Sequence, residues 1–328
     1  MLPIDKQQRA SGPAIHIVPP YMALNARRDL HFQSGDARCH AWLYLPEAPS
    51  PEAGAPPVLV MAHGLGAIKV LRLSAFAERF QAAGYACLVF DYRHFGESEG
   101  EPRELLSIAR QREDWQAALR FVRSLPEVDS SRVVLWGTSF GGGHVIATAA
   151  VDHGVVAAIA QCPFTDGLAS VRRIPFRESA RLILAGAKDR LAQLAARKPV
   201  RVKVAARPGE LGLMNDAESV DTVIALLEAS GLTEAEYRNE VPARIALEIA
   251  FDAPGRKAGQ IQCPILFCVC DADTVAPAKA TLRHAAKAPR GEIRRYPVGH
   301  FDIYMGEQFE RVVADQLAFL RTHVPVGA

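Results

Sequence analysis

Residues 133–142 read Val133-Val-Leu-Trp-Gly-Thr-Ser139-Phe-Gly-Gly142, an apolar strand-like run that leads into a Gly-x-Ser-x-Gly turn. A stretch compatible with a helix follows, up to Val151. A serine on a tight strand-to-helix turn is pushed out above the sheet, and the small residues Gly137 and Gly141 let neighbouring backbone pack against the bend. The flanking strand and helix therefore predict Ser139 as a nucleophile, which a bare Gly-x-Ser-x-Gly would not do.

The chain also supplies a candidate base and a candidate acid, which a serine needs because its hydroxyl is a weak nucleophile at neutral pH. An apolar run over 264–270 ends in Asp271-Ala-Asp273, and a second strand-like run over 291–297 delivers Val298-Gly299-His300. The chain order Ser139, Asp273, His300 is the one described for α/β-hydrolases, and it differs from the orders in chymotrypsin and subtilisin.

An oxyanion-binding loop is predicted upstream of the serine. A buried-type strand over 57–62 is followed by His63-Gly64-Leu65-Gly66, and the backbone N–H of Leu65 is the expected donor. The second expected donor is the backbone N–H of Phe140, directly after the serine. Two such N–H groups contribute about a few kcal/mol each to stabilising a transition state that carries an oxyanion.

From about Pro57 to its C-terminus the chain resembles the α/β-hydrolases, and within them the dienelactone-hydrolase-like serine hydrolases, a group that also includes polyketide transferases. The resemblance is carried by four stretches: His63-Gly-Leu-Gly66, Asp91-Tyr-Arg-His-Phe-Gly-Glu-Ser98, Gly137-Thr-Ser-Phe-Gly-Gly142 and Gly299-His-Phe-Asp-Ile-Tyr304. Dienelactone hydrolase itself uses a cysteine nucleophile, so the serine at position 139 means that its substrate is not implied. The serine also argues against haloalkane dehalogenase and epoxide hydrolase chemistry, for which the fold uses an aspartate.

The resemblance bears on the choice of acid. The Asp-x-x-x-Pro spacing from Asp273 to Pro277 resembles the acid loop of the family, which favours Asp273. Asp271 lies two residues earlier and stays open as the alternative.

Composition narrows the class of protein further. With 328 residues, of which 49% are apolar, the chain can form one large α/β domain with an insertion, or two domains. The net charge of +2 offers no general attraction to nucleic acid or to a membrane, so neither is predicted as a partner. The six cysteines lie mostly in strand-like runs without zinc-type spacing, so we expect reduced, buried thiols and no metal or cofactor. No continuous apolar segment follows the first basic residues, which predicts a cytoplasmic protein.

Strand and helix patterns alternate along most of the chain. After paired strands within 15–45, the expected strands are 57–62, 85–90, 131–136, 155–160, 264–270 and 291–296, and the expected helices are 70–83, 108–125, 140–151, 276–287 and 304–323. This alternation predicts an α/β-hydrolase fold, with a mostly parallel sheet and helices on both faces. The predicted organisation is a core in two parts, 1–168 and 261–328, separated by a helical cap over 169–260.

The predicted cap has no strand pattern, and helices are expected over 178–197, 217–230 and 233–250. In the family such caps shape the acyl or alkyl pocket, and the turn-rich stretch Arg207–Asp216 is expected to border it. The stretch Lys188–Arg207 carries seven cations against the single acid Asp189. We interpret it as a solvated helix face and loop, with attraction of an anionic substrate as the alternative.

The sequence therefore predicts a cofactor-free serine hydrolase that acts on a small-molecule ester or thioester. Ser139 would attack the acyl carbonyl, His300 would move the proton, Asp273 would orient the imidazole, and Leu65 and Phe140 would bind the oxyanion. Acyl transfer by the same residues is one alternative, and a non-catalytic binding protein of this fold is another. The sequence identifies no substrate-binding residue and no oligomeric state.

Overall fold

The computed structural model describes residues 27–47, 54–215 and 217–327. Eight strands form the main sheet in the order β1-β2-β4-β3-β5-β6-β10-β11. They are β1 (Arg27–Ser34), β2 (Ala37–Tyr44), β3 (Val58–Ala62), β4 (Ala86–Phe90), β5 (Val133–Thr138), β6 (Val155–Gln161), β10 (Ile265–Cys270) and β11 (Gly291–Tyr296). The pairs β1–β2 and β2–β4 are antiparallel, and the other neighbouring pairs are parallel.

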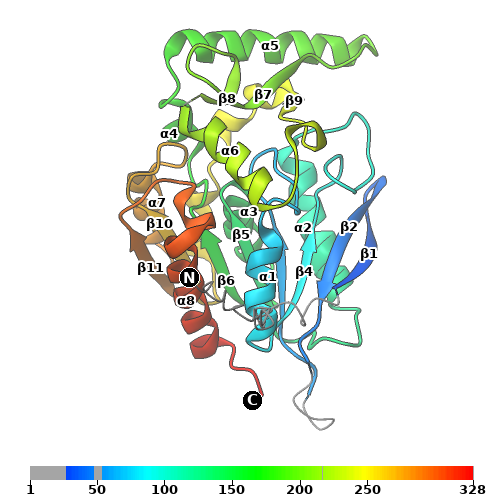
Figure 1. The fold of residues 1–328 in the computed structure, drawn as a ribbon, viewed down its shortest axis with the longest axis vertical. Coiled ribbons are helices and arrows are strands. Elements are labelled where there is room, and N and C mark those ends of the chain that lie inside the picture. Colours follow the sequence, from blue (N-terminus) through cyan, green and yellow to red (C-terminus); the bar gives the residue numbers. More distant parts are fainter. Residues whose placement is uncertain (1–26, 48–53, 216, 328) are drawn as a thin grey trace, which may run out of the picture.

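Helices cover both faces of this sheet (Figure 1). Within the described residues, the helices of the core are α1 (Leu73–Ala82), α2 (Ile108–Val122), α3 (Phe140–Ala149), α7 (Ala278–Ala285) and α8 (Gly306–His323). Helices α1 and α8 pack together on one face, while α2 and α3 pack on the other. Every residue of β3, β4, β5 and β10 is buried, as expected for parallel strands covered on both sides.

The predicted fold class is confirmed, and the strands and helices predicted for the core lie within a few residues of their observed bounds. The paired strands expected within 15–45 form the β1–β2 hairpin, whose turn contains Gly35 at φ 56°. The part of that prediction over 15–26 lies outside the described residues. Because parallel strands end at one edge of the sheet, β5, β6 and β10 bring their C-terminal loops together there.

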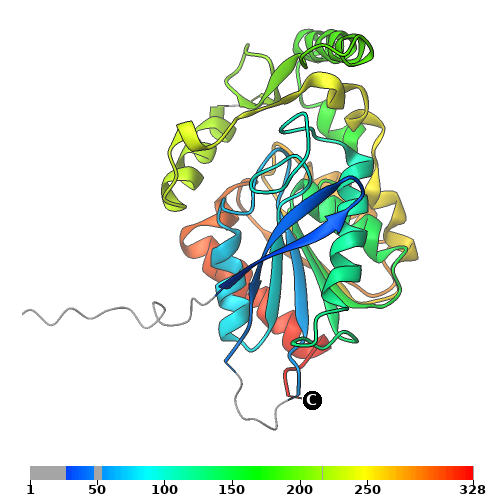
Figure 2. The same ribbon diagram turned by 90° about the vertical axis from the view of Figure 1, so that its right-hand side faces the viewer.

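The inserted segment lies over that edge (Figures 1 and 2). Its elements are α4 (Gly167–Val171), α5 (Phe176–Leu194), β7 (Arg201–Ala206), β8 (Gly212–Asn215), α6 (Ala217–Ala229), β9 (Glu240–Pro242) and four 3₁₀ turns, Glu234–Glu236, Ala243–Leu247, Ile249–Phe251 and Pro254–Gln260. Helices over 176–194 and 217–229 agree with the prediction.

Two predictions for this segment are wrong. A second sheet, in the order β8-β7-β9, lies where no strand was expected. The helix expected over 233–250 is instead one 3₁₀ turn, the strand β9 and two further 3₁₀ turns. Pro242 ends β9 in the middle of that range, and a proline interior to a helix removes a hydrogen bond and clashes with the preceding turn. The insertion is therefore a mixed α/β cap, and its boundaries at 168/169 and 260/261 stay predictions.

Candidate active site

Ser139 sits at the turn between β5 and α3, in a backbone conformation that side chains seldom adopt, with φ 54° and ψ −118°. Close packing holds this turn in place. A Cβ atom on Gly141 would lie 2.5 Å from the carbonyl oxygen of His63, and one on Gly137 would lie 2.4 Å from the carbonyl oxygen of Gly141. Only glycine fits at either position, which explains the spacing seen in the sequence. Strained backbone of this kind is typical of functional turns.

The structure brings Ser139, His300 and Asp273 into one hydrogen-bonded chain. His300 Nε2 lies 3.0 Å from Ser139 Oγ, and His300 Nδ1 lies 2.6 Å from Asp273 Oδ2. Asp273 also accepts the backbone N–H groups of Val275 at 2.8 Å and Ala276 at 2.6 Å, so its carboxylate is fixed from two sides. All three side chains are buried.

Asp271, the alternative acid, lies elsewhere. Its carboxylate accepts a hydrogen bond of 2.8 Å from Arg295 Nε, in an exposed ion pair on the neighbouring strand β11. Of the two aspartates that follow β10, the one that contacts His300 is Asp273.

The pKa of His300 is raised well above its ordinary value. Burial by itself lowers this pKa, because it disfavours the charged imidazolium. The negative charge of Asp273 and its hydrogen bond outweigh that effect, with a further contribution from the Cys162 thiol. An imidazole in this environment readily accepts a proton on Nε2, the atom that faces Ser139.

The two predicted oxyanion donors lie beside the serine. Phe140 is the first residue of α3, so its N–H belongs to the helix end where the amides have no intrahelical acceptor. A Cβ atom on Gly64 would lie 2.9 Å from the Cβ of Ser139, which places the loop before Leu65 directly against the turn. Within the described residues, neither the N–H of Leu65 nor that of Phe140 donates to a protein acceptor. Both amides are available to a ligand.

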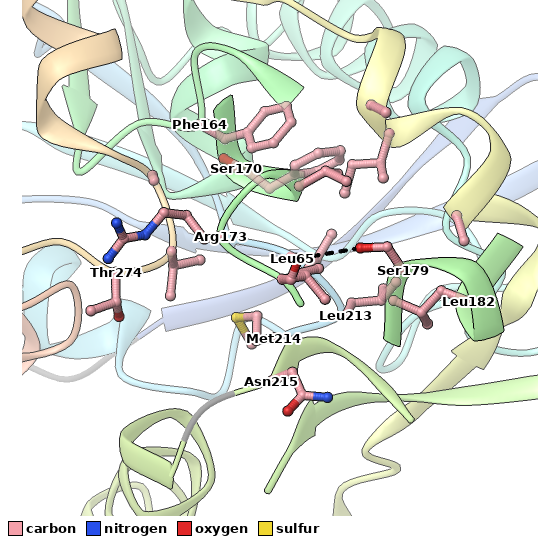
Figure 3. Close-up of a pocket in the computed structure, with 18 of the residues that line it drawn as sticks. Leu65, Phe164, Ser170, Arg173, Ser179, Leu182, Leu213, Met214, Asn215 and Thr274 are labelled. Atoms are coloured by element: carbon pink, nitrogen blue, oxygen red, sulfur yellow. Dashed lines mark hydrogen bonds between the residues drawn. The ribbon is translucent and has the colours of Figure 1, made fainter. Parts of the chain in front are cut away.

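A cavity of about 300 Å³, lined in part by Ser139, lies between the core and the insertion. Figure 3 shows residues from both that line it. Core residues in its lining include Leu65, Phe140 and Phe164, and the insertion contributes further apolar residues, among them Leu182, Leu213 and Met214. The expectation that 207–216 borders the pocket is confirmed for 213–215. The polar lining residues are Ser139, Ser170, Arg173, Ser179, Asn215 and Thr274. A mostly apolar wall with few polar groups is typical of small-molecule sites.

Two side chains near His300, those of Cys162 and Tyr304, were not predicted from the sequence. Cys162 follows β6, and its Sγ lies 3.9 Å from His300 Nε2 and 3.6 Å from the hydroxyl oxygen of Tyr304. Tyr304 in turn shares a hydrogen bond with Thr138, the residue before the serine. Tyr304 is the last residue of the Gly299–Tyr304 motif, and Cys162 directly follows a central strand. Ligands and functional side chains gather at the carboxyl ends of such strands, so these two positions could have been predicted as part of the site.

The basic stretch 188–207 is divided between two elements. Its first part ends α5, and its second part forms β7, where Arg201 pairs with Glu104 and Lys203 with Glu210. None of its cations lines the cavity at Ser139. Among the described residues, no group of three histidine, cysteine or acidic side chains is arranged to hold a metal ion.

Comparison with known proteins gives the family. The profile described as serine aminopeptidase, S33, matches residues 55–305. The chain belongs to this family of α/β-hydrolases. The quorum-quenching protein AidA of Acinetobacter baumannii is 50% identical over 315 residues, which cover 96% of this chain and 99% of that protein.

Two fungal proteins are more distant relatives. A thiohydrolase of Eupenicillium brefeldianum is 25% identical over 310 residues, covering 92% of this chain and 96% of its own length. Polyketide transferase grgF of Penicillium sp. is 27% identical over 306 residues, covering 91% and 97%. The crystal structure of α/β hydrolase GrgF from Penicillium sp. sh18 matches with a TM-score of 0.76 and 25% identity, over 90% of this chain and 98% of that one.

In the part of the chain that the structure describes, no helix has the length and apolar character needed to span a bilayer.

Proposed function

We propose that this protein is a serine hydrolase that cleaves a carboxylic ester or thioester through an acyl-enzyme intermediate. The observation that carries the proposal is the chain of two hydrogen bonds from Ser139 Oγ through His300 to Asp273, at the mouth of an apolar cavity. A nucleophile, a base within hydrogen-bond reach and a carboxylate that orients the base are the three groups that this chemistry needs.

In the first half of the reaction Ser139 Oγ bonds to the acyl carbon while its proton moves to His300 Nε2. The oxyanion accepts hydrogen bonds from the N–H groups of Leu65 and Phe140. The C–O or C–S bond to the leaving group then breaks, and the leaving group takes the proton from His300. In the second half water bonds to the acyl carbon and gives a proton to Nε2. The Ser139 ester bond then breaks, and Ser139 Oγ takes that proton back from Nε2 as the acid is released.

Asp273 keeps the proton of the neutral imidazole on Nδ1, which leaves Nε2 free to accept the proton of Ser139. The two backbone N–H groups that Asp273 accepts keep its carboxylate turned toward His300. This chemistry requires no metal or cofactor.

The cavity favours an acyl group of modest size and low polarity. Its volume of about 300 Å³ is at the lower end of the range usual for ligand pockets. The name of the related thiohydrolase supports a thioester, and that of AidA supports a signal molecule of quorum sensing as a second kind of substrate. A signal that contains an ester or lactone bond would suit the same residues.

Acyl transfer to a second substrate remains the alternative, supported by the name of polyketide transferase grgF. The same side chains would act, with an alcohol, amine or thiol in place of water. A non-catalytic binding protein is disfavoured because the nucleophile, base and acid are all present and in contact.

Product analysis on a panel of acyl esters and acyl thioesters of increasing chain length tests the proposal. We expect free acid as the dominant product, also with millimolar alcohol, amine or thiol present. Ser139→Ala should abolish turnover, while Ser124→Ala, a serine on the surface away from the cavity, should not change it. A dominant conjugate with the added acceptor would make the protein a transferase, and turnover by Ser139→Ala would remove the serine from the mechanism.

A further inference from the structure

Helix α5 has two apolar faces, of which the protein uses one. Leu182, Ala185 and Gly186 are buried, and the helix packs there against β7 and the turn Ala243–Leu247. Its other apolar side chains are exposed to an unusual degree. Phe176 is 86% exposed, Ile183 55%, Leu184 56%, Leu191 66% and Leu194 76%.

These five exposed side chains form one stripe. At 3.6 residues per turn they fall within a sector about 100° wide, on the side of the helix opposite the buried residues. We call them the α5 stripe. In both views of the molecule α5 is the outermost element at its end (Figures 1 and 2). Ile183, at one edge of the stripe, also lines the cavity at Ser139. An exposed apolar surface of this kind marks an interaction site.

The charges around the stripe are of one sign. From residue 172 to 198 the chain carries eight cations, Arg172, Arg173, Arg177, Arg181, Lys188, Arg190, Arg197 and Lys198. The acids in this range are Glu178 and Asp189, and Asp189 is buried in an ion pair with Arg244. Helical spacing places Arg177, Arg181 and Lys188 along one edge of the stripe and Arg190 along the other.

None of these eight cations has a carboxylate partner within the described residues. Arg181 donates to the carbonyl oxygen of Gly209, and Arg190 donates to the amide oxygen of Gln193. Five exposed arginines elsewhere are paired: Arg28 with Glu127, Arg38 with Glu99, Arg79 with Glu310, Arg110 with Asp36 and Arg207 with Asp221. Among the described residues, exposed cations such as Arg120 and Arg256 also lack a carboxylate partner. What distinguishes this segment is that its unpaired cations flank an exposed apolar stripe.

We propose that α5 docks flat on an anionic lipid surface, with the stripe in the acyl region and the flanking cations among the headgroups. A helix with Phe and Leu on one face and Lys and Arg beside them has the composition of helices that lie in a membrane interface. The net charge of +2 gave no reason to expect this partner, because it averages the basic segment with the rest of the chain.

The positive charge around the α5 stripe also argues against two other binding partners for it, a second copy of this chain and residues 1–26. A second copy of this chain would bring two basic helices together, and like charges across an interface oppose association. Residues 1–26, which lie outside the described structure, contain one acid, Asp5, against the two cations Lys6 and Arg9. They therefore do not supply the missing negative charge either.

Sedimentation with lipid vesicles tests the proposal on the full chain. We expect binding to vesicles of phosphatidylcholine mixed with phosphatidylserine, and little binding to phosphatidylcholine alone. Binding should weaken as salt rises from 0.1 M to 1 M, because the screening length falls from about 10 Å to about 3 Å. Ser139→Ala should bind as the unmodified protein does, since docking does not depend on the chemistry of the serine.

Two double variants separate the contributions of the stripe and the cations. Leu191→Ser with Leu194→Ser should weaken binding about tenfold or more, and so should Arg177→Gln with Lys188→Gln. Val151→Ser and Arg120→Gln, which change an exposed apolar residue and an exposed cation far from α5 in the sequence, are the matched controls and should bind normally. Thermal unfolding should be similar in all variants because the changed side chains are exposed.

Equal binding to neutral and anionic vesicles, or normal binding by both double variants, would overturn the proposal. So would a dimer in analytical ultracentrifugation that dissociates on Leu191→Ser with Leu194→Ser, because the occupant of the stripe would then be a second copy of the chain.

Discussion

The two-part core and the inserted segment contribute differently to the cavity between them. Ser139, Asp273 and His300 all belong to the core, where hydrogen bonds and close backbone packing fix their positions. The insertion contributes walls such as Leu182 and Leu213, which touch the cavity through apolar side chains. Reactivity and selectivity thus depend on different stretches of sequence, and single substitutions should separate them.

The largest effect is expected in the core. His300→Ala should lower kcat on the order of 10⁶-fold, as much as Ser139→Ala, because nucleophile and base act as one unit. The double variant should be no slower than either single variant. Multiplied losses in the double variant would mean that the two residues act independently, which the 3.0 Å contact between them argues against.

A smaller loss of kcat is expected when the orienting acid, Asp273, is replaced. Asp273→Asn should lower kcat by about 10⁴-fold, because an amide at this position favours the wrong tautomer of His300. Asp271→Asn removes an exposed ion pair with Arg295 and should leave kcat within a few fold of normal, by analogy with the low value of surface ion pairs. The reverse result would assign the acid to Asp271.

Substitutions in the insertion should act on substrate choice. Leu182→Ala and Leu213→Ala enlarge the cavity, and one methylene of substrate is worth about 1–3 kcal/mol, or about 10- to 200-fold in kcat/KM ratios. We expect a shift toward longer acyl chains across the panel of esters. The rate of labelling by a small fluorophosphonate, which reports on Ser139 alone, should change little. Equal losses for every chain length would show that the insertion supports reactivity as well.

The dependence of activity on pH should follow His300. The imidazole must be neutral to accept the proton of Ser139, so kcat/KM falls as pH drops through the pKa of His300 in the free enzyme. Because Asp273 raises this pKa, the midpoint of the acidic limb should lie above the ordinary value of about 6.5. A midpoint at or below that value would mean that burial outweighs the carboxylate.

The core could be predicted from sequence because its signals are local and repeated. Strands β3, β5 and β10 are short apolar runs that end in loops with distinctive residues, such as Gly137 and Gly141 around Ser139. Those glycines are required by contacts of 2.4–2.5 Å that any Cβ atom would make, so the spacing in the sequence records the geometry directly. The distance from His300 to Asp273 could not be read from spacing, because residues 273 and 300 meet through the pairing of β10 with β11.

The structure of the insertion was harder to predict, because its strands are short and its basic residues suggested a solvated helix face where a strand lies. The first four residues of β7 do alternate, with Val202 and Val204 buried, Arg201 half-buried and Lys203 exposed. The cations made this stretch resemble a solvated helix face. Strands β8 and β9 have four and three residues, too few for a periodic pattern. The cavity lining depends on how these elements dock over the core, which no local pattern encodes.

The most direct test of the central claim is to map the site of a fluorophosphonate adduct by peptide mass spectrometry. Ser139 should carry the adduct in the unmodified protein, and His300→Ala should react much more slowly because the serine has lost its base. Leu213→Ala should label at Ser139 at close to the normal rate. An adduct on any other residue, or equal labelling of Ser139 in the absence of His300, would contradict the assignment of reactivity to the core residues.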